Sequence, residues 1–138
     1  MKKIALSLMF VALIAACGQN NRKAGNADEQ LAVADPNIVQ VYYFHGKERC
    51  KTCIAVGDIA LKTVENAYTN NPNVRFIEIN TSEESAKALV KKYEVTWNAL
   101  IIAKGNNSVD ITQQAFATAL GNPQSLENLI KDEVNKRL

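Results

Sequence analysis

Apolar and polar residues follow one another along this chain in patterns typical of strands and helices. A nearly continuous run of β-branched and aromatic residues at 38–44 is typical of a central strand. In the next segment, 53–67, apolar residues recur at helical spacing, and the polar residues and proline at 69–72 are expected to end that helix. A second apolar run at 74–79 predicts a second strand.

The middle of the chain predicts a helix and then a hairpin. Residues 81–84, with the sequence TSEE, have the spacing of a capping box, and the helix they begin carries an apolar face from 86 to 93. Residues 99–102 predict a third strand, and the alternating segment 109–112 predicts a fourth. The turn residues at 104–107 connect them as a hairpin.

The C-terminal pattern completes the predicted order. Residues 113–120 are ambiguous and are compatible with a short helix. Asn122 and Pro123 are typical of a helix cap followed by proline at the first helical position, so a last helix follows them. The predicted order is therefore β-α-β-α-β-β-α, which indicates an α/β domain over 37–138.

The N-terminus has the features of an export signal. Two lysines follow Met1, and the apolar run at 4–16 is shorter than the roughly 20 residues that span a membrane. Its end, 13–17 with the sequence LIAAC, resembles the lipobox of bacterial lipoproteins. The resemblance implies a signal peptide over 1–16 that is cleaved before Cys17, and lipid on the sulfur of Cys17. An ordinary signal peptide with an incidental cysteine is the alternative.

The segment after Cys17 changes the expected location and charge of the protein. Residues 17–36 contain little to bury and predict a lipidated, flexible tether. We therefore expect a lipid-anchored protein of the bacterial cell envelope, facing the periplasm, with Gly18 slightly favouring the outer membrane. Of 16 basic residues, Lys2 and Lys3 are removed with the signal peptide, which leaves 14 against 14 acidic residues. This neutral balance gives no argument for nucleic-acid binding.

Two cysteines remain for chemistry once Cys17 carries lipid. Cys50 and Cys53 are three residues apart, and an oxidising compartment would hold them as a disulfide unless a dedicated donor reduced them. A ring this short stabilises a fold much less than a disulfide that spans a domain. A redox role is therefore favoured over a purely structural one.

The CxxC motif and its position carry a family resemblance. A strand, then residues 49–53 with the sequence RCKTC, then a helix, set within this element order, resemble the thioredoxin-like superfamily over 37–138. The resemblance implies a three-layer sandwich with a mixed four-stranded sheet and flanking helices. It also implies a thiol–disulfide oxidoreductase that needs no organic cofactor. Its partners would be cysteine-containing exported proteins and a membrane electron donor or acceptor.

The motif assigns different roles to the two sulfurs. If Cys50 begins the helix, its sulfur lies near free backbone N–H groups and the positive end of the helix dipole, which favour the thiolate. Cys50 is then the nucleophile, and Cys53 resolves the mixed disulfide. Arg49 and Lys51 would favour the thiolate further, although a solvated basic edge is the plainer interpretation of both.

Several positions differ from the thioredoxin pattern. Arg49 stands where thioredoxins have tryptophan, and Ala99 lies at or beside the place of their cis-proline, where we expect a trans peptide bond. No acidic residue in the first strand matches their buried carboxylate. Trp97 either covers the disulfide and helps to recognise a partner or is an ordinary core aromatic. Gly57 either permits a kink in the helix or allows close packing against a strand.

His45, the only histidine, leaves alternative functions open. Together with Cys50 and Cys53 it would form a three-ligand site for copper or zinc, and a copper-handling module is one alternative. In the other interpretation, His45 is a polar residue at a strand end that tunes the local field, and no metal is bound. A further alternative is a non-catalytic interaction lipoprotein whose thiols are incidental.

Overall fold

The structure is a computed structural model that describes residues 35–138. The predicted signal peptide, the lipidation site at Cys17 and nearly all of the predicted tether lie outside these residues. None of the described helices is both long and apolar enough to cross a membrane. The elements are β1 (Val39–His45), α2 (Lys51–Tyr68), β2 (Val74–Asn80), the 3₁₀ turn η1 (Glu84–Ala86), α3 (Lys87–Lys92), β3 (Ala99–Lys104), β4 (Asn107–Asp110), α4 (Thr112–Thr118) and α5 (Pro123–Asn135).

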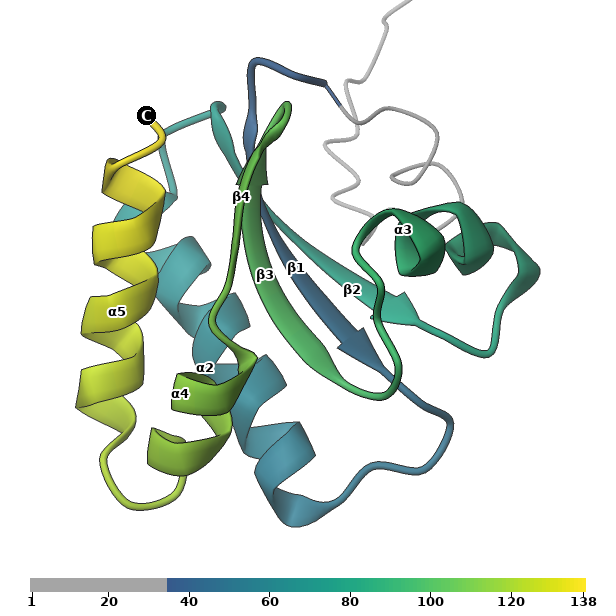
Figure 1. The fold of residues 1–138 in the computed structure, drawn as a ribbon. Coiled ribbons are helices and arrows are strands. Elements are labelled where there is room, and N and C mark those ends of the chain that lie inside the picture. Colours follow the sequence, from purple (N-terminus) through teal and green to yellow (C-terminus); the bar gives the residue numbers. More distant parts are fainter. Residues whose placement is uncertain (1–34) are drawn as a thin grey trace, which may run out of the picture.

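The strands form one mixed sheet in the order β2-β1-β3-β4. β1 and β2 are parallel, whereas β3 is antiparallel to both β1 and β4. Helices α2, α4 and α5 cover one face of the sheet, and η1 with α3 covers the other (Figure 1). The predicted α/β class, with a four-stranded mixed sheet between flanking helices, is confirmed.

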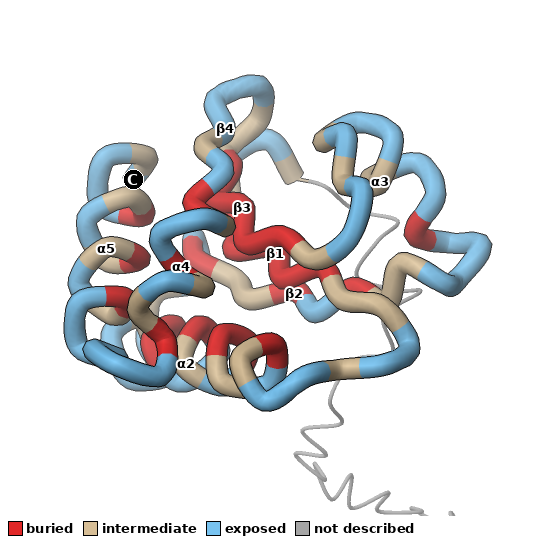
Figure 2. Tube along the Cα trace, turned by 60° about the horizontal axis from the view of Figure 1, so that its bottom comes forward, coloured by how far each residue is buried: buried red, intermediate tan, exposed pale blue. Residues whose placement is uncertain are grey.

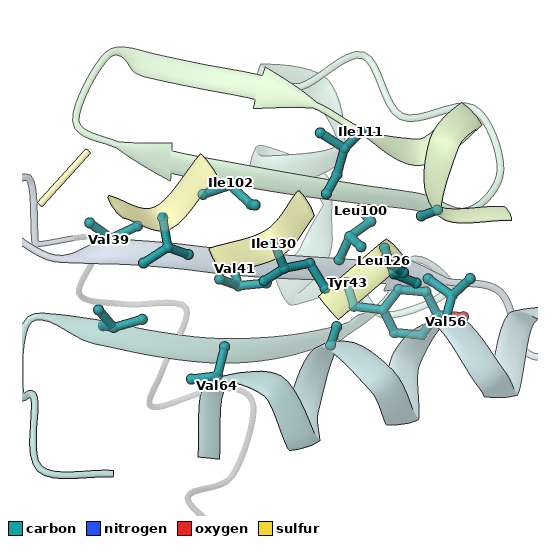
Figure 3. Close-up of a cluster of buried hydrophobic side chains, with 14 of the residues drawn as sticks. Val39, Val41, Tyr43, Val56, Val64, Leu100, Ile102, Ile111, Leu126 and Ile130 are labelled. Atoms are coloured by element: carbon teal, nitrogen blue, oxygen red, sulfur yellow. The ribbon is translucent and has the colours of Figure 1, made fainter. Parts of the chain in front are cut away.

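The apolar run in β1 reflects a central strand that is buried on both faces. Val41 and Tyr43 pack with α2 and α5, and the side chains of Tyr42 and Phe44 alternate with them to reach the α3 side. Figure 2 shows that burial is concentrated in β1, β3 and the inner face of α2. Figure 3 shows the larger cluster, in which Tyr43 lies close to Val56 of α2.

The capping box predicted at 81–84 is wrong. The Thr81 hydroxyl donates instead to the backbone oxygen of His45, at 3.1 Å, and so ties the end of β2 to the end of β1. The chain becomes helical only at Glu84, where η1 begins without a side-chain cap on Glu83. The local pattern predicted that the Thr81 hydroxyl caps a helix N-terminus, but in the structure it bonds to the backbone carbonyl of His45 instead.

The C-terminal elements differ in part from their predicted limits. β4 lies at Asn107–Asp110 instead of 109–112, because Ile111 turns into the core and Thr112 begins α4. The ambiguous segment is thus a short helix. Asn122 and Pro123 begin α5 as predicted, and the Asn122 side chain accepts from the Ser125 N–H at 3.1 Å.

Candidate redox site

The two cysteines occupy the first turn of α2 and are joined as a disulfide, with their Cα atoms 5.0 Å apart. Cys50 is the N-cap of the helix, in an extended conformation, and its sulfur accepts from the Cys53 N–H at 3.2 Å. Cys50 is exposed, whereas Cys53 is only 4% exposed. A partner thiolate can therefore approach the Cys50 sulfur far more readily than the Cys53 sulfur.

Tyr43 of β1 holds the first turn of α2 against the sheet. Its hydroxyl donates to the backbone oxygen of Cys53 at 2.6 Å, and the whole side chain is buried. Burial raises the pKa of Tyr43, which outweighs the opposing effect of the nearby Arg49 cation. The phenol therefore remains a neutral donor at physiological pH and holds the first turn of α2 against the sheet.

Arg49 is ion-paired and stacked, so its interpretation as a solvated basic edge is wrong, while its effect on the Cys50 thiolate stays a prediction. Its guanidinium lies 5.4 Å from the centre of the Tyr43 ring, and its Nη1 lies 2.8 Å from Oε1 of Glu78 on β2. Arg49 is therefore not a freely solvated cation. Its charge is also largely matched by the Glu78 carboxylate, which weakens any effect on the Cys50 sulfur.

Gly57 makes this stack possible. A Cβ atom at Gly57 would lie 2.7 Å from Cε1 of Tyr43 and 2.8 Å from Nη2 of Arg49. Such distances are too short for a real contact, so the position has no room for a side chain unless Tyr43 and Arg49 move. Close packing against β1 thus accounts for Gly57, and α2 runs through it without interruption.

His45 contacts the same carboxylate from the end of β1. Its Nε2 lies 3.4 Å from Oε1 of Glu78, and its Nδ1 donates to the Gly46 backbone oxygen at 2.8 Å. Within residues 35–138 no group of three or more His, Cys, Asp or Glu side chains is arranged to hold a metal ion. The set of His45, Cys50 and Cys53 is therefore not among such groups, and in this structure the two sulfurs are bonded to each other.

The loop before β3 brings Trp97 and Ala99 to the disulfide side of the molecule. Trp97 is 78% exposed, so its interpretation as a core aromatic is wrong. With Phe116 of α4 it lines an open depression that also contains both cysteines. Ala99 is buried at the start of β3 opposite Phe44, and the described residues contain no cis peptide bond. Lys51 is exposed to solvent.

Two site residues were not predicted from the sequence. Asn98 places its Nδ2 atom 3.7 Å from the Cys53 sulfur, and its Oδ1 accepts from the Gly46 N–H at 3.3 Å. Glu78 joins Arg49 and His45 from the neighbouring strand. Asn98 could have been proposed from the sequence, because it is a polar amide directly before Ala99. The position of Glu78 beside Arg49 could not, because it depends on the register between β1 and β2.

The mixed four-stranded sheet, the flanking helices and the disulfide at the start of the helix after β1 all match the thioredoxin-like pattern that the sequence predicts. The chain has a thioredoxin-like fold. An exposed sulfur at a helix N-terminus, bonded to a buried one, supports a thiol–disulfide oxidoreductase in general.

The chain was also compared with known proteins, and it is similar to solved structures. No protein-family model matches the sequence, and no curated protein matches it. Mitochondrial thioredoxin 3 from Saccharomyces cerevisiae, in its oxidised form, is 25% identical, with 75% of this chain and 87% of that chain covered and a TM-score of 0.48. A structure described as that of a malarial protein is 19% identical, with 71% and 99% covered and a TM-score of 0.46.

Proposed function

We propose that this protein is an envelope-anchored thiol–disulfide oxidoreductase that exchanges disulfides with exported proteins through Cys50 and Cys53. The observation that carries the proposal is the asymmetry of the disulfide, since Cys50 is exposed while Cys53 is buried. A reactive disulfide needs one sulfur open to a partner and another held beside it to complete the exchange.

The chemistry uses two thiol–disulfide exchanges. A partner thiolate attacks the Cys50 sulfur, the Cys50–Cys53 bond breaks, and Cys53 leaves as a thiolate. A second partner thiolate then attacks the partner sulfur of this mixed disulfide and releases the Cys50 thiolate. The partner loses two electrons and two protons, and the protein gains a dithiol. The reverse sequence reduces a partner disulfide, with Cys50 as the nucleophile.

The surroundings of Cys50 suit a polypeptide partner. The depression beside the disulfide is open, and Trp97 lines it with a large exposed apolar side chain. Exposed aromatic residues of this kind are common anchors in protein interfaces. In our proposal Trp97 contacts the segment of the exported protein that presents its cysteine.

Single-cysteine variants test the exchange directly. The protein is incubated with an oxidised protein substrate such as insulin, and products are separated without reduction. We expect Cys53→Ser to accumulate a mixed disulfide through Cys50, and Cys50→Ser to accumulate little. Equal trapping by both variants, or none by either, would remove the support for an oxidoreductase.

The anchor rests on the N-terminal sequence pattern and needs its own test. Expressed in a bacterium, the protein should incorporate labelled palmitate and fractionate with membranes. Cys17→Ser should abolish both while leaving the disulfide exchange of the purified protein unchanged. Labelling that survives this substitution, or a soluble wild-type protein, would exclude the lipid anchor.

A further inference from the structure

Asn98 is the side chain that donates a hydrogen bond to the Cys53 sulfur in the described part of the chain. The residue precedes β3 and lies 45 positions from Cys53 in the sequence. Its nitrogen end is the one that faces the sulfur, at 3.7 Å. This distance is within the reach of a hydrogen bond to sulfur, whose larger radius lengthens the contact.

The orientation of the Asn98 amide is fixed by its other end. Oδ1 accepts from the backbone N–H of Gly46, at 3.3 Å, at the loop that follows β1. If the amide were flipped, its NH₂ group would meet the Gly46 N–H and its oxygen would meet the sulfur, so both contacts would be unfavourable. The fold therefore aims a donor at the Cys53 sulfur.

Other sources of stabilisation for that sulfur are weak. Cys53 is almost fully buried, so water has little access to it. The Arg49 cation is bound to Glu78, and the Tyr43 hydroxyl is directed to the Cys53 backbone oxygen. A charge on a buried sulfur is costly unless a donor is present.

We propose that the Asn98 amide is a catalytic group that stabilises negative charge on the Cys53 sulfur during exchange. The inference rests on the proposed function, because the charge forms when the disulfide is opened. A partner thiolate bonds to the Cys50 sulfur, the Cys50–Cys53 bond breaks, and its electron pair stays on Cys53 as a thiolate. The Asn98 N–H donates to that thiolate, and no proton is transferred in the step.

The same contact favours the return step. When Cys53 attacks the Cys50 sulfur of a mixed disulfide, it must first be ionised, and the Asn98 donor raises the population of that form. A hydrogen bond to a charged group is stronger than one between neutral groups. The contact to sulfur is long, so we expect a modest effect, roughly tenfold on rate.

Two substitutions separate this role from a structural one. Asn98→Ala removes both contacts, whereas Asn98→Asp keeps an acceptor for the Gly46 N–H and replaces the donor by a carboxylate. Opening of the oxidised protein by glutathione is measured under pseudo-first-order conditions. We expect opening to be about tenfold slower in Asn98→Ala and slower still in Asn98→Asp. Asn106→Asp, in the exposed β3–β4 turn, makes the same charge change away from the site and should be unaffected.

Direct titration of Cys53 gives a second readout. In the reduced Cys50→Ser protein, the ultraviolet absorbance of the thiolate reports Cys53 alone among residues 35–138. We expect Asn98→Ala to lower the ratio of thiolate to thiol about tenfold at a given pH, and Asn98→Asp to lower it further. If Asn98→Asp matches wild type in both measurements, Asn98 only holds the loop and the inference is overturned.

The two proposals fail in different ways. If the wild-type protein exchanges with glutathione but neither single-cysteine variant traps a protein substrate, the proposed function is contradicted and the Asn98 measurements remain interpretable. Normal trapping together with an unchanged Cys53 titration in Asn98→Ala would overturn the role of Asn98 alone. Thermal unfolding of each variant identifies any rate change that comes from loss of the fold.

Discussion

Helices α2 and α5 begin with the same hydrogen-bond geometry and different chemistry. At α5, Oδ1 of Asn122 accepts from the backbone N–H three residues later, at 3.1 Å. At α2, the Cys50 sulfur accepts from the N–H at the same spacing, at 3.2 Å. Both caps satisfy a free donor of the first turn. Only the α2 cap, however, is an atom that can be attacked and reduced.

The surroundings of the two helix ends also differ. The first turn of α5 bonds mainly within itself, as Gln124 does with Glu127 and Asn128 on the exposed surface. The first turn of α2 is contacted by β1 through Tyr43 and by the loop before β3 through Asn98. A helix N-terminus becomes a candidate redox site here because distant segments fix its sulfurs in place.

Replacing the sulfur cap is expected to have the largest effect. In Cys50→Ser the hydroxyl can still accept from the Cys53 N–H, because serine is a favoured N-cap. We expect the turnover of insulin disulfides to fall to the rate without protein. The reduced wild-type protein is the reference for stability, since the variant also lacks the disulfide.

The matched change at α5 is Asn122→Ser, which also exchanges one capping group for a hydroxyl. It should leave both turnover and stability close to wild type. Turnover that persisted in Cys50→Ser would show that the sulfur cap is not the reactive group, and the contrast between the two helices would disappear.

Gly57→Ala tests the packing behind the α2 site. Alanine favours a helix over glycine by about 1 kcal/mol, yet its Cβ would overlap Tyr43 and Arg49. Tyr43 cannot withdraw easily, because its hydroxyl is bonded to the Cys53 oxygen. Overpacking costs about 1–3 kcal/mol, so we expect a net loss in the free energy of unfolding, measured by denaturant titration.

Gly121, next to the α5 cap, provides the control for that change. Nothing lies within 4 Å of a Cβ atom built there, so Gly121→Ala should alter the unfolding free energy by less than about 0.5 kcal/mol. A Gly57→Ala protein more stable than wild type would show that Tyr43 and Arg49 can move aside at little cost, which would contradict the expected overpacking.

Asn122→Ala removes the α5 cap altogether. We expect a loss of about 1 kcal/mol in the free energy of unfolding, because the Ser125 N–H loses its side-chain acceptor and keeps only the Asn122 backbone oxygen, at 3.0 Å. The rate of disulfide opening by glutathione should not change, since α5 contributes stability and no reacting group. A slower opening rate in this variant would show that the two helix ends are coupled.

Local sequence patterns were sufficient for the helix cap at Asn122 and for the order of elements apart from α4, whose segment they left ambiguous, because periodicity, turn residues and caps act over a few positions. They also placed Cys50 at a helix N-terminus. They failed at Thr81, whose hydroxyl bonds to a carbonyl that only the folded sheet brings near.

The contacts around the candidate site depend on the tertiary structure. Glu78 reaches Arg49 because β2 pairs with β1 in a register that puts Glu78 opposite Tyr43, and no local rule specifies that register. The exposure of Trp97 likewise follows from the path of the loop before β3, since aromatic residues are usually buried.

A substitution at the C-terminal end of α5, Glu133→Gln, is expected to have the smallest effect on the free energy of unfolding, and this effect depends on pH. Hydrogen bonds from Lys136 and Arg137, at 2.5 and 2.8 Å, lower the pKa of Glu133. A lowered pKa in the folded state means that the stabilisation is present above the ordinary glutamate pKa and is lost as pH falls through the folded value. We expect Glu133→Gln to cost about 0.5 kcal/mol near neutral pH and nothing in strong acid, where wild type has lost the same contribution. Unfolding curves at several pH values measure this difference.

Glu133 lies at the end of α5, which carries no reacting sulfur, so the turnover of insulin disulfides by Glu133→Gln at neutral pH should match wild type. A loss of activity in this variant would contradict the conclusion that α5 contributes stability alone and α2 carries the chemistry.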